Sequence, residues 1–299
     1  MLDIARRNSR EAEILEVVFS NGWDFMRRLL SGDKTDEPEL PPPAVLRNIL
    51  TDLGPVYIKL GQLMSTRPDL LPPSYLEALE TLQSDVPPVP WPEIEPVIRA
   101  NLPQPIEQAF ASIDHQPIAA GSIAQVHRVI RHDGKPMALK VQRPGIDTLV
   151  ARDVALIHNI AKLVAATDFG KEYDTIGLAE EFTQALYAEL DFTLEAEHTN
   201  KLRANLTHSD WFDPDLIKIP EVDLELTRPK VMVMEWLEGQ PLLLAKLDGR
   251  RHQGDIAAER RELTRTIFRV FFQQFLTDGF FHADPHPGNI FYLKDGRIA

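Results

Sequence analysis

The segment that decides the fold is FHADPHPGNI, residues 281–290, in which four polar side chains, two prolines and a glycine lie between apolar ends. Asp284 and Asn289 stand five residues apart in it. A carboxylate can accept or orient a hydroxyl nucleophile, and an asparagine oxygen can bind Mg²⁺ without adding charge to a phosphate-rich site. The spacing therefore predicts that Asp284 is catalytic and that Asn289 binds a metal.

This spacing is typical of the catalytic loop of kinases. Two other interpretations stay open. In the first, the segment is a turn stiffened by proline, in which Asp and His side chains cap backbone groups. In the second, the pattern His282-x-Asp284-x-His286 is a metal site for hydrolysis, which stoichiometric zinc in the purified protein would reveal.

A second signal is a predicted β-hairpin whose turn is Asp133-Gly134. Its second arm places Lys140 in an apolar strand, in the manner of the kinase lysine that contacts nucleotide phosphates. The alternative for Lys140 is a solvated position at a sheet edge. Upstream lies a short small-residue segment where a phosphate-covering turn belongs, although it has one glycine instead of three. Its residues are Ala119, Ala120, Gly121 and Ser122.

A third signal is a cluster of carboxylates on the predicted helix 175–205. Asp191 and Glu195 are four residues apart, so we expect them to share a face of that helix. One of these carboxylates is a candidate partner for Lys140. The alternative is an ordinary solvated acidic helix.

A fourth signal lies in the predicted helix 44–64, which Gly54-Pro55 should break or kink. Lys59 and Gln62 bracket Gly61 in an otherwise apolar stretch. Composition does not explain this arrangement. The alternative is a glycine that lets two helices pack closely, beside a lysine whose stem covers apolar surface.

Composition limits the function classes. The 299-residue chain has a formal net charge of −13, which argues against a general nucleic-acid binder, and it has no cysteine for a disulfide or a thiolate site. We find no apolar run long enough to span a membrane and no secretory signal. We therefore expect a cytoplasmic protein, with peripheral membrane association left open.

The order of predicted elements favours an α+β fold over a doubly wound sheet, because alternating βαβ units are absent. We expect an N-terminal helix at 1–31 with a linker to 40, a helical region at 41–115, a mixed region at 116–239 and a last region at 240–299. Helices are predicted after Pro72-Pro73, near 91–100, at 147–166 and at 263–278. Further strands are predicted at 215–220 and 228–235, and a final hairpin turn at 295–296.

Together these motifs resemble the ABC1/ADCK/UbiB family of atypical protein-kinase-like proteins. Lys59, Gly61 and Gln62 are similar to its KxGQ signature, residues 119–126 to its alanine-rich replacement for the glycine-rich loop, and Glu189-x-Asp191 to its ExD motif. The resemblance runs from about residue 40 to the C-terminus.

The resemblance implies a protein-kinase-like fold with a complete N-lobe, an N-terminal helical KxGQ extension and only the start of the C-lobe. It implies ATP and Mg²⁺ as cofactors and a role in isoprenoid quinone synthesis or lipid homeostasis, as an ATPase or a small-molecule or lipid kinase. The implied partners are an isoprenoid lipid or quinone precursor and a peripheral membrane or quinone-biosynthesis complex. Residues implied to bind the cofactor are Lys59, Gln62, Ala119, Ala120, Gly121, Ser122, Lys140, Glu189, Asp191 and Glu195.

The resemblance also implies that the helices bearing Lys59 pack over a nucleotide cleft, so that Lys59, Lys140 and Asp284 converge on one Mg-triphosphate crevice. Either Glu189 or Glu195 would pair with Lys140 and the other with Lys59, and spacing alone does not decide between them.

Two other classes of function stay open. A small-molecule phosphotransferase of the antibiotic-kinase type shares the pattern of the polar segment, but it lacks a unit like residues 59–62. A non-enzymatic lipid- or partner-binding remnant would use an exposed Phe268/Phe272 face.

Residues 290–299, which follow Asn289, contain no Asp-Phe-Gly triplet to supply the second metal-binding aspartate of kinases. We expect a truncated copy that does not hold Mg–ATP in a productive geometry. An assay of ATP turnover by this chain should give no signal. Turnover that Asp284→Asn abolishes would contradict this expectation.

Overall fold

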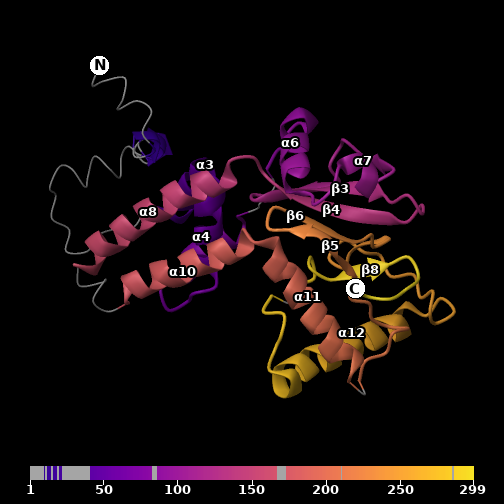
Figure 1. Cartoon of the computed structure of the whole chain (residues 1–299). Coiled ribbons are helices and arrows are strands. Elements are labelled where there is room, and N and C mark those ends of the chain that lie inside the picture. The colour runs from indigo at the N-terminus through magenta and orange to yellow at the C-terminus, as the bar shows by residue number, and fades with distance from the viewer. Residues whose placement is uncertain are drawn as a thin grey trace. The chain divides into compact units, whose positions relative to one another are not determined.

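The computed structural model describes residues 10, 12–14, 16–18, 20–21, 41–82, 86–166, 173–209, 211–284 and 286–299 (Figure 1). The expected helix at 1–31 and its linker lie mostly outside these residues, and the described positions between 10 and 21 are helical. The chain divides into two compact units. The first contains residues 1–94, 119–125 and 142–190, and the second contains 95–118, 126–141 and 191–299.

The first unit is built from helices. Gly54, with φ of +96°, ends α3 and precedes Pro55, which begins α4, so the predicted break is confirmed. Pro73 begins the next helix, as predicted. The helices are α3 (Pro43–Leu53), α4 (Pro55–Ser65), α5 (Pro73–Glu80), α8 (Ile146–Ala165) and α10 (Thr175–Glu189).

One apolar core holds these helices together. It is formed by aliphatic and aromatic side chains on one face of each helix, which is the pattern that amphipathic periodicity produces. Its buried members include Leu50, Tyr57, Leu79, Val150 and Phe182.

The strands form an antiparallel sheet with the order β1-β3-β4-β6-β5, most of it in the second unit, and β2 (Ala119–Ala120) pairs with β3. The predicted hairpin is formed by β3 and β4, whose turn includes Gly134 at φ of +84°. The strands are β1 (Ser112–Ile113), β3 (Ala124–Ile130), β4 (Pro136–Gln142), β5 (Val222–Arg228) and β6 (Val231–Glu235).

Helices and a small second sheet complete this part of the chain. Figure 1 shows α11 running beneath the strands, and it contacts β5 and β6. The predicted final hairpin is present, with Gly296 at its turn, and β8 pairs with β7. These elements are α6 (Trp91–Asn101), α7 (Ile106–Ala109), α11 (Phe192–Thr207), β7 (Gly239–Pro241), α12 (Ile256–Gln273), the π-helical turn η1 (Gln274–Asp278) and β8 (Phe291–Leu293).

Two predictions about secondary structure are wrong. The helix predicted at 175–205 is broken: α10 ends at Glu189, and Asp191 is the N-cap of α11 with extended backbone angles. Asp191 and Glu195 therefore do not share a face of one helix. The strand predicted at 215–220 is reduced to a single bridge between Ile217 and Ile298, and the missed strand lies just after it, at Val222–Arg228.

Within the described residues, no helix combines the length and the apolar character needed to cross a bilayer. The aromatic face expected on α12 is exposed: Phe268 and Phe272 stack with ring centroids 6.1 Å apart and are 61% and 50% exposed.

A buried ion pair joins Arg10 to α8 within the first unit. Asp153 is fully buried, and both of its carboxylate oxygens accept from the Arg10 guanidinium, at 2.7 and 2.9 Å. Arg10 also donates to the Leu53 carbonyl at the end of α3. The guanidinium lies 5.8 Å from the ring centre of Tyr57, whose pKa burial raises to about 12.

We expect Arg10→Met to destabilise the protein by about 3 kcal/mol, because a buried carboxylate that loses its cation partner is strongly unfavourable. Urea denaturation measures the change. Glu13→Gln is the matched control, since it removes the exposed partner of the same arginine and should cost no more than about 0.5 kcal/mol. Equal effects of the two substitutions would contradict the role given to Asp153.

Candidate functional site

The polar loop, residues 282–289 with Pro285 outside the described residues, follows η1 and precedes β8. Asn289 Nδ2 donates to Asp284 Oδ2 at 2.7 Å, and the Asn289 backbone amide donates to the His286 carbonyl at 2.8 Å. The two residues that spacing selected are thus in direct contact. Since the amide nitrogen faces the carboxylate, the side-chain oxygen of Asn289 takes no part in this bond.

Both histidines of the polar loop act on its backbone. His282 Nδ1 accepts from the Asp284 amide at 3.2 Å, and His286 Nδ1 accepts from the Gly288 amide at 3.1 Å. Among the described residues, no three His, Asp or Glu side chains converge as metal ligands. The zinc-hydrolase alternative therefore has no support in this part of the chain.

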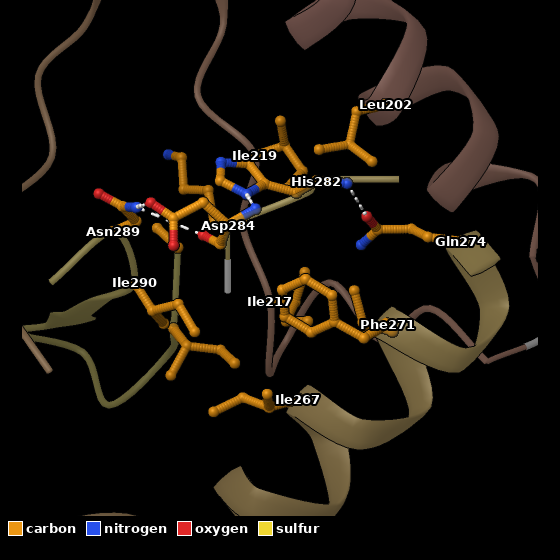
Figure 2. Close-up of a pocket in the computed structure, with 14 residues that line it drawn as sticks. Leu202, Ile217, Ile219, Ile267, Phe271, Gln274, His282, Asp284, Asn289 and Ile290 are labelled. Carbon is orange, nitrogen blue, oxygen red and sulfur yellow. Dashed lines mark hydrogen bonds between the residues drawn. The ribbon is translucent and has the colours of Figure 1, made fainter. Parts of the chain in front are cut away.

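A cavity opens beside Asp284 (Figure 2). Its walls are mainly aliphatic, and the polar groups His282, Asp284, Asn289 and Gln274 lie around it. Figure 2 shows the helix with Phe271 and Gln274 on one side and the Asp284–Asn289 pair on the other. The apolar lining includes Leu202, Ile217, Ile219, Ile267, Phe271 and Ile290.

The Asp284–Asn289 pair fits the ligand preference of Mg²⁺. A carboxylate and an amide oxygen are hard donors, and Mg²⁺ in phosphate-transfer sites takes one or two protein ligands together with phosphate oxygens and water. The hydrogen bond between the two side chains fixes their separation before any cation arrives.

Lys140 lies on β4, where Leu139 and Val141 on the opposite face are buried. Its Nζ makes an ion pair with Glu195 Oε2 at 2.5 Å and lies 4.7 Å from the ring centre of Phe192. The side chains are 28% and 44% exposed, so the pair remains open to solvent. The choice that spacing left open is resolved by geometry: Lys140 pairs with Glu195.

Asp191 has a separate task at the start of α11. Its Oδ1 accepts from the Thr193 amide at 3.0 Å and from the Thr193 hydroxyl, which satisfies a free amide of the first turn. This cap sets where the helix begins, and so sets the position of Glu195 one turn further on. In this structure, Asp191 acts as a helix cap.

Lys59 has its own carboxylate within the first unit. Its Nζ lies 3.0 and 2.9 Å from the two oxygens of Glu189, the last residue of α10. Gln62, one turn further along α4, donates to the Leu82 carbonyl at 3.1 Å. Its amide nitrogen therefore ties α4 to the chain after α5.

The small-residue segment is held by Arg143. Arg143 Nε donates to the Gly121 carbonyl at 2.8 Å, and its Nη2 reaches the Pro87 carbonyl at 2.9 Å. The Gly121 amide closes a turn onto the Ala124 carbonyl, and Ser122 is buried. Desolvation lowers the pKa of Arg143. Sequence reasoning missed Arg143, because nothing in the pattern around it marks an arginine that binds carbonyls far along the chain.

A lysine–glutamate pair at an antiparallel sheet, a carboxylate–asparagine loop between a long helix and a short strand, and an α+β architecture together define a protein-kinase-like fold. Residues 81–299, more than half of the chain, match the model of the ABC1 atypical kinase-like domain. The chain belongs to this ABC1 family.

Several relatives are similar to it. A Synechocystis protein named "Uncharacterized protein slr0889" is 53% identical over 299 residues, which is all of this chain and 73% of that protein. "Probable protein kinase UbiB" of Cellvibrio japonicus is 37% identical over 88% of this chain and 46% of its own length. "Protein ACTIVITY OF BC1 COMPLEX KINASE 3, chloroplastic" of Arabidopsis thaliana is 37% identical over 85% of this chain and 34% of its own. The chain thus spans less than half of the two named kinases.

Among solved structures, the complex of Rv3197 with erythromycin from Mycobacterium tuberculosis is similar, with a TM-score of 0.58 and 30% identity. The match covers 84% of this chain and 60% of Rv3197. The kinase-like fold class predicted from the sequence is confirmed.

Gly61 is buried at a close helix contact, as the packing alternative predicts. A Cβ there would lie 2.3 Å from Leu82 Cδ1 and 2.9 Å from Leu50 Cδ1, both in the packed core.

Gly61→Val should therefore destabilise the protein by about 2 kcal/mol through overpacking. Thermal or urea unfolding measures this change. Leu63→Val, on the exposed side of the same helix, should stay within about 0.5 kcal/mol of the parent; a Gly61→Val midpoint equal to that control would refute the close contact.

Proposed function

We propose that this chain is an atypical kinase-like protein that binds ATP with Mg²⁺. The observation that carries the proposal is the Lys140–Glu195 ion pair on the same unit as the Asp284–Asn289 loop. A surface lysine needs no dedicated carboxylate, whereas a phosphate-binding lysine gains from one that fixes its ammonium before the ligand arrives.

In this proposal each side chain has a distinct task. Lys140 donates to nucleotide phosphates while Glu195 holds its ammonium in place. Asn289 and Asp284 offer oxygens to Mg²⁺, which when bound neutralises phosphate charge. Asp284 is also proposed to orient the hydroxyl of an acceptor; within the loop its Oδ1 accepts from the His286 amide at 3.3 Å and its Oδ2 from Asn289 Nδ2 at 2.7 Å. Ala119, Ala120, Gly121 and Ser122 approach the phosphates through their backbone.

Gln62, Glu189 and Lys59 stay candidates for contacts to the nucleotide, with Asp191 acting through the position of Glu195. Support for these roles comes from the family resemblance and from their fixed geometry within each unit. Lys59 is already neutralised by Glu189, so a phosphate would have to compete with that carboxylate.

The process that we propose is isoprenoid quinone synthesis or lipid homeostasis, with peripheral attachment to a membrane. Two of the relatives carry the names UbiB and ACTIVITY OF BC1 COMPLEX KINASE, and these names support a kinase-like role in that setting. A strain that lacks the gene should contain less isoprenoid quinone or an altered lipid profile, and a gene that carries Lys140→Met should fail to restore it.

A second candidate function is binding of a bulky apolar small molecule. The aliphatic cavity beside Asp284 favours it, and the similar Rv3197 structure is a complex with erythromycin. Titration with erythromycin in the absence of nucleotide tests this candidate. Stabilisation by the macrolide that Ile267→Glu removes would support it.

ATP binding is the direct test of the main proposal. Lys140→Met should weaken Mg–ATP binding about 10-fold, equivalent to about 1.4 kcal/mol, because one charged phosphate contact is lost. Isothermal titration or nucleotide-dependent thermal stabilisation gives the affinity. Lys135→Met is the control, since Lys135 lies on the same hairpin and is exposed.

Two outcomes would contradict the proposal. One is a parent chain that shows no Mg–ATP binding at millimolar nucleotide. The other is a Lys140→Met variant that binds as tightly as Lys135→Met.

A further inference from the structure

The buried stripe of α12 ends on a polar residue. Leu263, Thr266, Val270 and Gln274 follow one another at spacings of three and four residues, and all are buried. The last of these positions would ordinarily hold a leucine or a similar apolar residue. Gln274 instead is 2% exposed, and a buried amide is costly unless it is hydrogen-bonded.

The hydrogen bond that satisfies Gln274 points to the polar loop. Its Oε1 accepts from the backbone amide of His282 at 2.9 Å, eight residues further along the chain (Figure 2). His282 is the first residue of the polar loop. The side chain thus fixes the point at which the chain turns from η1 into the Asp284–Asn289 segment.

The helix geometry at this point also favours a special role. Gln274 is the first residue of the π-helical turn η1, and such turns occur often at functional sites. Gln273 Nε2 donates to Asp278 Oδ1 at 2.8 Å and so bridges the turn. Gly279, with φ of +59°, then ends it.

Hydrogen bonds continue from His282 to the proposed metal ligands. His282 Nδ1 accepts from the Asp284 amide, and Asp284 Oδ2 accepts from Asn289 Nδ2. Gln274 lines the same cavity as these residues. A displacement of the His282 backbone would therefore be passed on to the carboxylate of Asp284.

We propose that Gln274 is a positioning residue that holds the start of the polar loop and thereby keeps Asp284 and Asn289 ready to bind a divalent cation with nucleotide. The metal part of this inference rests on the proposed function. The loop-holding part does not.

The test compares the parent with Gln274→Met, which keeps the size of the side chain and removes the acceptor. Thr266→Val is the control, since it makes an isosteric polar-to-apolar change in the same buried stripe. All variants are made in the full chain, and their thermal midpoints are recorded.

The first readout is hydrogen exchange of the His282 backbone amide without any ligand. Gln274→Met should speed this exchange about 10-fold through loss of one hydrogen bond, while Thr266→Val stays near the parent rate. Unchanged exchange in Gln274→Met would overturn the inference.

The second readout is the affinity for Mn²⁺ in the presence of ATP, compared with the affinity for ATP alone. Gln274→Met should weaken Mn²⁺ binding about 10-fold and leave metal-free ATP binding unchanged, as expected for a residue that orients metal ligands. If the parent binds Mn²⁺ with ATP and Gln274→Met binds it equally well, the metal part is refuted. If the parent binds neither, the proposed function fails, and the exchange experiment alone decides whether Gln274 holds the loop.

Discussion

The ion pair between Lys140 on β4 and Glu195 on α11 is the contact on which the candidate site of the second unit depends. The partner, Glu195, is brought there by α11. Asp191 caps the start of this helix, and the Phe192 amide donates to the Pro229 carbonyl at the turn between β5 and β6. The ring of Phe192 then lies beside the ammonium. The start of α11, the turn between β5 and β6 and the Lys140–Glu195 ion pair are therefore linked through Asp191 and Phe192.

The first unit contains a lysine–glutamate pair of its own, between Lys59 and Glu189. Glu189 and Glu195 are only six residues apart, yet the break at Leu190-Asp191 assigns each to its own lysine. Gln142 stabilises that break, because its Nε2 donates to the Leu190 carbonyl at 2.5 Å. If α10 and α11 were one continuous helix, the carboxylates of Glu189 and Glu195 would point in other directions. One of the two lysines, Lys59 or Lys140, would then lack its partner.

Patterns that act over a few residues were readable from the sequence. The break at Gly54-Pro55, the hairpin before Lys140 and the contact between Asp284 and Asn289 all follow from local backbone preferences or short spacing. The break after Glu189 was not readable, because residues 187–195 contain no proline or glycine and have ordinary helix propensity. Partners distant in sequence, Pro229 and the strand residue Gln142, decide it.

Two buried polar residues, Glu259 on α12 and Gln274 at the start of η1, make the contacts that fix the partly exposed polar loop. Glu259, fully buried near the start of the helix, accepts from the Tyr292 hydroxyl and from the Gly249 amide, each at 2.8 Å. Burial and this glutamate raise the pKa of Tyr292, so its hydroxyl stays a donor. Gln274, at the other end, holds His282. Gln274 anchors the first residue of the polar loop and Glu259 anchors Tyr292 on β8 after it, so α12 and the π-helical turn that continues it hold both ends of the segment that carries Asp284 and Asn289.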